Sequence, residues 1–85
     1  MQLFDRQAEL LMERMRGSKP AAIATLAHTL KGSAIGIGAA RVARAAAATE
    51  LAASCAPGEC SGAIDQLSQA VDEVRVEIAA LQRIG

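Results

Sequence analysis

The chain has 85 residues, which fits one small domain over residues 1–85 and excludes a second domain or a large cofactor-enclosing fold. Hydrophobic residues make up 52% of it, but twenty of these are alanines and only one is aromatic, so we expect a thin core where helices approach closely. Nine acidic and nine basic residues balance to a net charge of zero, which argues against a nucleic-acid partner and against binding to a membrane surface.

The apolar runs, the first residues and the two cysteines indicate the cellular compartment in which the protein is expected. No run of 18 apolar residues could span a bilayer, and the first residues lack the basic and apolar regions of a signal peptide. We therefore expect a cytoplasmic protein, and the Met1 start favours a free-standing one. In a reducing cytosol Cys55 and Cys60 are expected to be thiols flanking a turn, with a short-loop disulfide as the alternative. Two cysteines and one distant histidine do not form a zinc site, so we expect no metal and no cofactor.

Helical periodicity covers the chain and is broken at three places that contain Gly or Pro, so the sequence predicts four helices. The breaks lie at 17–20, 36–38 and 56–58. The predicted helices cover about 2–16, 18–36, 38–54 and 61–84, with Ser18 as the N-cap of the second. Because short connections make successive helices antiparallel neighbours, the predicted fold is an all-α, up-down four-helix bundle.

Three of the predicted helices carry an apolar stripe that is expected to face the core. The stripe of the first helix is Phe4, Ala8, Leu11 and Met15, and that of the second is Ile23, Leu26, Leu30, Ala34 and Ile37. The last helix has a heptad-like stripe of Ile64, Leu67, Val71, Val74, Ile78 and Leu81.

The only histidine, His28, lies opposite the core stripe of the second helix, at about 100° per residue. A solvent face normally carries long charged side chains, but this one is small or apolar apart from one lysine. The residues that share the face with His28 are Ala21, Ala24, Thr25, Lys31, Gly32 and Ile35. Gly32 costs about 1 kcal/mol relative to alanine inside a helix. A lone exposed histidine is usually an ordinary surface residue, but departures from local rules that converge on one face indicate a functional site.

The chemistry that this face suggests is nucleophilic. A neutral imidazole has a ring nitrogen with a free lone pair, and exposure lets the reactive phosphorus of a partner reach it. Lys31 can neutralise a phosphoryl group held on His28, and Gly32 leaves room for the approach. The sequence has no Gly-rich nucleotide loop, no carboxylate cluster for Mg²⁺ and no Ser–His–Asp arrangement. The chain is therefore suited to holding a phosphoryl group and not to taking one from ATP alone.

The segment 28–34, His-Thr-Leu-Lys-Gly-Ser-Ala, resembles the H-x-L-K-G-S signature of histidine phosphotransfer (HPt) domains, which are four-helix bundles of about this length. Gly38-Ala39 matches the Gly-Ala that usually follows in the family, and Glu50 falls where the family often places a Glu or Gln that orients the histidine. Four positions differ from the residues usual in the family, namely Gly36, Val42, Ala46 and Thr49.

The resemblance implies a phosphorelay intermediate, not an enzyme. His28 would accept a phosphoryl group on Nε2 from a response-regulator receiver domain or a sensor histidine kinase and pass it to another receiver. The partner would supply the aspartate and the Mg²⁺. Lys31 would steady the phosphate, Gly32 would give access, and Glu50 would hold Nδ1–H. Ala21, Ala24, Thr25 and Ile35 would form the docking patch.

Helix geometry agrees with the role that the resemblance gives to Glu50. With the turn centred near Ile37, the two residues differ in axial position by roughly 6 Å, and their side chains lean toward each other. The alternative is a solvated surface glutamate. Ser33 is expected to bond back to the Thr29 carbonyl, a structural role for a hydroxyl inside a helix.

Two other classes of function are left open by the residues. The heptad-like stripe of the last helix could pair with another chain, which would make the protein a non-catalytic adaptor or a degenerate HPt domain. A phosphatase or other free-standing enzyme is the third hypothesis, but no second catalytic group accompanies His28. Between oligomeric states we favour a monomer over a dimer.

Overall fold

The computed structural model describes residues 2–84, and within this range it is built from helices with no strand. Four long helices are joined by short connections, the last of which contains one 3₁₀ turn. The helices are α1 (Gln2–Arg16), α2 (Pro20–Gly36), α3 (Ala40–Cys55) and α4 (Cys60–Ile84), and the 3₁₀ turn is η1 (Pro57–Glu59). The all-α prediction is confirmed, and the predicted helix bounds hold to within two residues.

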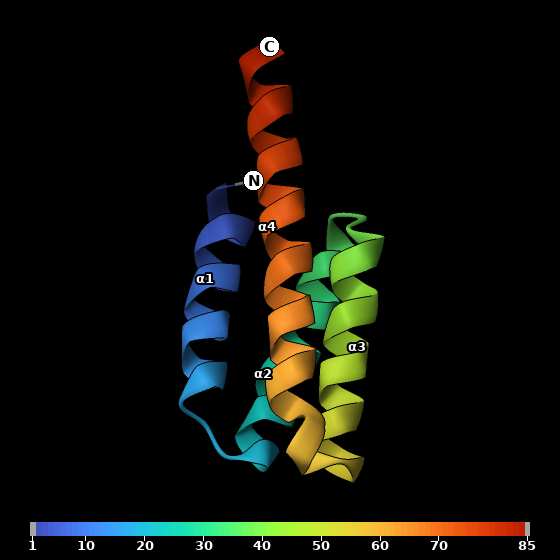
Figure 1. The fold of residues 1–85 in the computed structure, drawn as a ribbon. Helices are drawn as coiled ribbons and strands as arrows, with labels where there is room; N and C mark the ends of the chain where they lie inside the picture. The colour runs from blue at the N-terminus through green and yellow to red at the C-terminus, as the bar shows by residue number, and fades with distance from the viewer. Residues whose placement is uncertain (1, 85) are drawn as a thin grey trace.

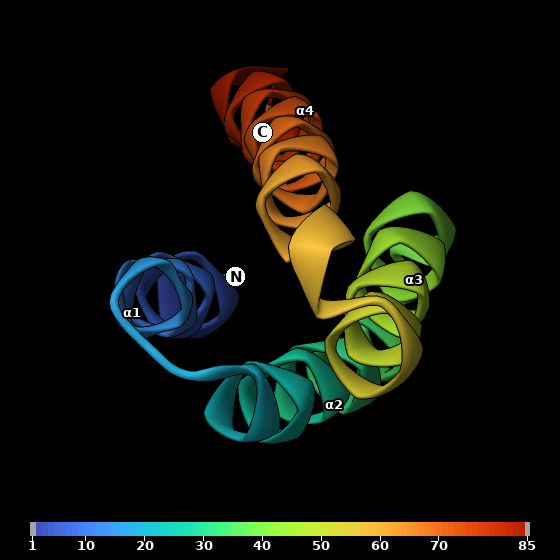
Figure 2. The same cartoon turned by 60° about the horizontal axis from the view of Figure 1, so that its bottom comes forward.

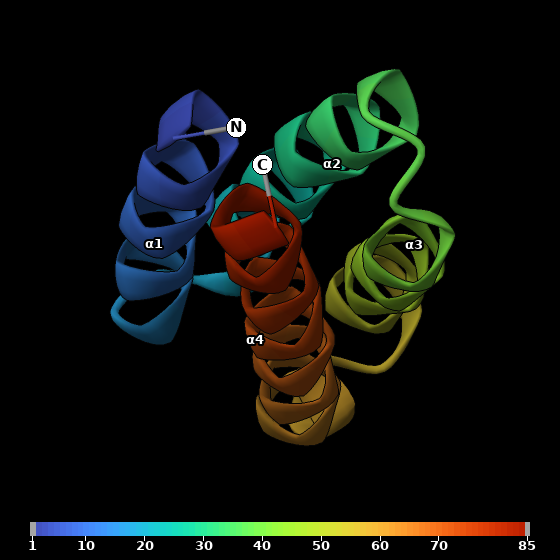
Figure 3. The same cartoon turned by 90° about the horizontal axis from the view of Figure 1, so that it is seen from above.

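The chain direction reverses at every connection, as Figure 1 shows. Figures 2 and 3, which view the bundle obliquely from below and from above, place α4 across from α2, with α1 and α3 on either side. The most extensive helix–helix contact is between α2 and α3. Because α2 is covered by other helices on its inner side alone, its outward face is open to a partner.

The connection between α1 and α2 differs from the prediction. The residue that precedes α2 is Lys19, in an extended conformation (φ −73°, ψ 160°) and with no side-chain capping bond. Ser18 instead donates from Oγ to the Arg14 carbonyl at 2.5 Å, so it satisfies a terminal carbonyl of α1. The Ser18 N-cap prediction is therefore wrong, because the preceding helix has the nearer unsatisfied group. Pro20 occupies the first turn of α2, where its missing N–H removes no helical hydrogen bond.

The turn between α2 and α3 depends on Gly38, which has a positive φ of 75°. The backbone N–H of Ala39 donates to Ala34 O at 2.8 Å, and that of Gly38 donates to Ile35 O at 3.1 Å. These two bonds satisfy carbonyls at the end of α2 in a manner typical of a glycine-terminated helix. As a result α3 begins at Ala40, two residues later than predicted.

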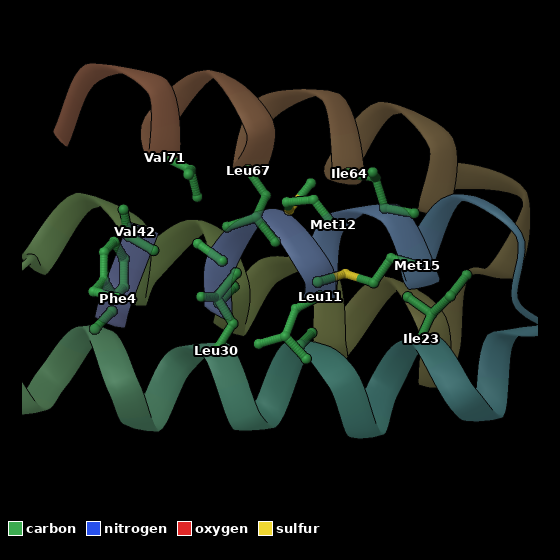
Figure 4. Close-up of a cluster of buried hydrophobic side chains, with 14 of the residues drawn as sticks. Phe4, Leu11, Met12, Met15, Ile23, Leu30, Val42, Ile64, Leu67 and Val71 are labelled. Carbon is green, nitrogen blue, oxygen red and sulfur yellow. The ribbon is translucent and has the colours of Figure 1, made fainter. Parts of the chain in front are cut away.

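The core lies between the four helices and consists mostly of aliphatic and methionine side chains, together with Phe4 (Figure 4). The predicted stripe of α1 is buried throughout, and Met12 joins it. On α2 the buried residues are Ile23, Ala27, Leu30 and Ala34, whereas Leu26 and Ile37 are only partly covered. The buried face of α2 is thus rotated toward Ala27 relative to the prediction, because α3 packs close against that side.

Thr49 shows how α3 is held against α4. Its side chain is completely buried, and Oγ1 donates to Ala45 O at 2.9 Å and lies 3.3 Å from Ala63 O of α4. A buried hydroxyl that has found such partners carries no desolvation penalty from an unmet bond. Thr49 therefore links α3 to α4, and its neighbour Glu50 is turned toward α2.

The helix α4 extends past the other three (Figure 1). Its 25 residues span about 37 Å, against about 22 Å for the 15 residues of α1. Ile78 is the last buried residue of the stripe, and Leu81 is 69% exposed, so the prediction that Leu81 faces the core is wrong. Most of the stripe is used inside the bundle, which leaves little of it for pairing with another chain.

The two cysteines lie at helix ends on either side of the last connection. Cys55 ends α3 and is exposed, and Cys60 begins α4 and is buried. Both are free thiols in the structure, as the first interpretation of the sequence expected, and not a disulfide.

Candidate functional site: an exposed imidazole held by a carboxylate

The outward face of α2 presents His28 near the middle of the helix, with 67% of its side chain exposed. The neighbouring core residue Ala27 is completely buried, and so is Leu30. These two fix the rotation of α2 about its axis, and His28 consequently points away from the core. The ring is neither tucked into the bundle nor covered by another segment among residues 2–84.

Glu50 of α3 reaches His28 across the α2–α3 interface. The distance from Nδ1 to Oε2 is 3.0 Å, which is a hydrogen bond. An ionised carboxylate can only accept, so Nδ1–H is the donor. In the neutral ring the hydrogen is then on Nδ1, and Nε2 has a lone pair that faces away from Glu50.

Lys31 contacts the other oxygen of the same carboxylate. Its Nζ lies 3.5 Å from Glu50 Oε1, and about two thirds of the lysine side chain is covered. The carboxylate therefore lies between an imidazole and an ammonium group, and holds both within one helical turn of α2. Because the pair is partly solvated, its effect on stability is small, and its main effect is on orientation.

Gly32 leaves open space beside the imidazole. A methyl group built on its Cα would meet no atom within 4 Å, so packing inside the chain does not require glycine here. Gly32 lies one turn after His28 and lowers the stability of an exposed helix by about 1 kcal/mol relative to alanine. Packing among residues 2–84 does not explain a glycine at this position.

The four residues of the predicted docking patch differ in how far they are exposed to solvent. Ala21, Thr25 and Ile35 are exposed, and Ile35 is 64% exposed although it is large and apolar. Ala24 is half-buried and packs against the core, because it lies on the side of α2 that faces α3. The Thr25 hydroxyl donates to the Ala21 carbonyl at 3.3 Å.

Ser33 does not bond back along its own helix as predicted. Its Oγ donates to Gln7 Oε1 of α1 at 2.8 Å in a partly buried site. An interhelical partner was available because Gln7 lies on the side of α1 that faces α2. Sequence periodicity could place Gln7 near this boundary but carried no signal for the pairing itself.

Two further observations concern other classes of site. Among the described residues no group of three or more His, Cys, Asp or Glu side chains is placed to hold a metal ion. No helix within residues 2–84 combines the length and the hydropathy needed to cross a membrane.

Comparison with known proteins identifies the family of the chain. The family model of the Hpt domain matches residues 1–84, which is nearly the whole chain. Neither a search of curated proteins nor a search of solved structures gives a match. The chain belongs to the Hpt domain family, whose members are phosphotransfer intermediates of two-component phosphorelays.

Proposed function

We propose that His28 is the phosphoryl-accepting residue of this protein and that its partners are the aspartyl-phosphate receiver domains of response regulators. The observation that carries the proposal is the Nδ1–H···Oε2 hydrogen bond between His28 and Glu50 on an open face of α2. It supports the ring tautomer in which the exposed nitrogen is the nucleophile.

The transfer needs only His28, Glu50 and the groups that the partner brings. The Nε2 lone pair attacks the phosphorus of an aspartyl phosphate, an N–P bond forms, and the P–O bond to the partner's carboxylate breaks. The carboxylate leaves with the bonding pair, and Nδ1–H stays on the ring, held by Glu50. The reverse sequence passes the phosphoryl group to a second receiver.

The charges around the site suit this exchange. A phosphoryl group adds nearly two negative charges beside Glu50. The Lys31 ammonium, 3.5 Å from Glu50 Oε1, is close enough to turn from the carboxylate to the phosphoryl oxygens. The receiver supplies its aspartate and the Mg²⁺, so the protein acts as a relay and not as an independent catalyst. We place this relay in the cytoplasm.

The proposal is tested by incubating the protein with phosphorylated receiver domains from the source organism. We expect an acid-labile, base-stable phosphoryl group on the wild-type chain and none on His28→Gln. Glutamine keeps a polar side chain of comparable reach, so circular dichroism should show unchanged helicity. Transfer that survives the substitution would remove His28 as the acceptor.

A further inference from the structure

The chemistry proposed for His28 depends on where Glu50 holds its carboxylate. The two carboxylate oxygens lie 3.0 Å from His28 Nδ1 and 3.5 Å from Lys31 Nζ, across the α2–α3 interface. The end of a side chain lies about 5–6 Å from the helix axis, so turning α3 by about 20° would move the carboxylate by about 2 Å. A hydrogen bond does not survive such a displacement. The rotation of α3 about its own axis is therefore part of the site.

The apolar contacts of α3 constrain this rotation only loosely. The buried stripe of the helix consists of Val42, Ala46, Thr49 and Ala53. Two of these are alanines, and a methyl group makes few of the contacts by which a long buried side chain resists turning. The ion pair between Arg41 and Glu73 joins α3 to α4 at 2.9 Å, but both side chains are exposed and such pairs are weak. A directional contact close to Glu50 therefore has the greatest influence on the rotation.

Thr49 makes such a contact. Its side chain is completely buried, and Oγ1 lies 2.9 Å from Ala45 O of α3 and 3.3 Å from Ala63 O of α4. The hydroxyl has one hydrogen, which two carbonyls can share in a three-centre bond. The contact with Ala45 O fixes the rotamer of Thr49, and the contact with Ala63 O fixes that side of α3 against the main chain of α4.

The position of Thr49 directly before Glu50 connects this contact to the site. Successive residues of a helix point about 100° apart. The α3 helix has α4 on one side and α2 on the other, as Figures 2 and 3 show. When Thr49 faces α4, Glu50 consequently faces the seam with α2, where His28 lies.

We infer that Thr49 is a positioning residue for the transfer, because its hydroxyl, held between Ala45 O and Ala63 O, sets the rotation of α3 at which Glu50 binds Nδ1–H of His28. This inference rests on the proposed function. It adds to the site a residue that touches neither the imidazole nor the incoming phosphoryl group.

The ring tautomer of His28, read from ¹⁵N NMR of the chain without any receiver, tests the positioning directly. Thr49→Val keeps the branched shape and removes the hydroxyl, so part of the population should move toward the Nε2–H form. Thr49→Ser keeps the hydroxyl and should restore the wild-type tautomer. An unchanged tautomer in Thr49→Val overturns the inference.

A matched control separates positioning from a general loss of stability. Leu11 is a core residue of α1, which packs against α2 and α4. Leu11→Val removes one methylene at a distance from α3. Urea denaturation should show a loss of stability comparable to that of Thr49→Val, while the tautomer and the transfer rate stay as in the wild type. An equal tautomer shift in Leu11→Val would assign the effect to stability and not to Thr49.

Transfer from a phosphorylated receiver shows whether Thr49 acts through Glu50. Thr49→Val should slow transfer about threefold to fivefold, which is less than the loss of Glu50 itself, since a displaced carboxylate keeps part of its effect. In the Glu50→Ala chain there is no carboxylate to position, so adding Thr49→Val should slow transfer no further. Equal slowing in both backgrounds overturns the inference. If no receiver phosphorylates the wild-type chain, the proposed function fails, whereas the NMR result still decides whether Thr49 positions Glu50.

Discussion

At the scale of single residues, Glu50 is the position on which the site depends most. One carboxylate contacts both His28 and Lys31. Substitutions of Glu50 can therefore separate its role as a hydrogen-bond acceptor for His28 from the role of its charge in holding Lys31. Glutamine retains an acceptor for Nδ1–H but removes the charge that holds the ammonium, and alanine removes both.

We expect Glu50→Ala to slow phosphoryl transfer about tenfold, because a hydrogen bond to a charged group contributes about 1.5–3 kcal/mol and part of it is lost to solvent here. Glu50→Gln should retain most of the rate. The ring tautomer, read from ¹⁵N NMR, should move toward the Nε2–H form in Glu50→Ala alone. An unchanged tautomer would show that the contact does not orient the imidazole.

For Lys31→Ala we expect slower transfer, by about tenfold, without loss of the fold. The ammonium would no longer offset the charge of the incoming phosphoryl group, whereas a partly solvated ion pair adds at most about 1 kcal/mol to stability. Single-turnover transfer and urea denaturation measure the two effects. A large loss of stability with a normal rate would assign Lys31 a structural role.

At the scale of helices, two nearby glycines, Gly32 and Gly38, differ in backbone conformation. Gly32 is in regular helix with open space around it, whereas Gly38 has a φ of 75° at the α2–α3 turn. The first conformation suits alanine and the second does not.

Gly32→Ala should therefore raise the free energy of unfolding by about 1 kcal/mol, and Gly38→Ala should lower it by about 1–2 kcal/mol. Urea denaturation of both variants measures the difference. We expect the stabilised Gly32→Ala chain to transfer phosphoryl groups more slowly than the wild type, since the added methyl group would occupy open space on the face from which a partner approaches His28. If Gly32→Ala is destabilised, the chain itself requires the glycine.

At the scale of the whole molecule, the length of α4 divides its apolar stripe into a covered and an uncovered part. Ile78 is 8% exposed and Leu81, one turn further, is 69% exposed. The boundary of the core therefore lies between these two residues.

Ile78→Ala should cost about 2–4 kcal/mol of stability and Leu81→Ala less than about 0.5 kcal/mol. Chemical denaturation of the two variants gives both values. Comparable losses would mean that the end of α4 is covered in solution, for example by a second copy of the chain, and sedimentation would then show a dimer.

The sequence predicted the helices and their order because Gly and Pro interrupt an otherwise continuous helical pattern. It also placed His28 on the outward face, since a periodicity of 3.6 residues determines which side chains share a side. Apart from the His28–Glu50 pair, which the family resemblance implied, it did not give the contacts between helices. Three features depend on where neighbouring helices lie and end. They are the Ser33–Gln7 bond, the rotation of α2 toward Ala27 and the exposure of Leu81.

The α2–α3 turn at Gly38 has a consequence for how such a protein can diverge. His28, Lys31 and Glu50 all belong to the hairpin that this turn closes. The groups that we propose for the transfer therefore lie on one continuous segment of the chain. The sequences of α1 and α4 can change while this reactive hairpin is kept.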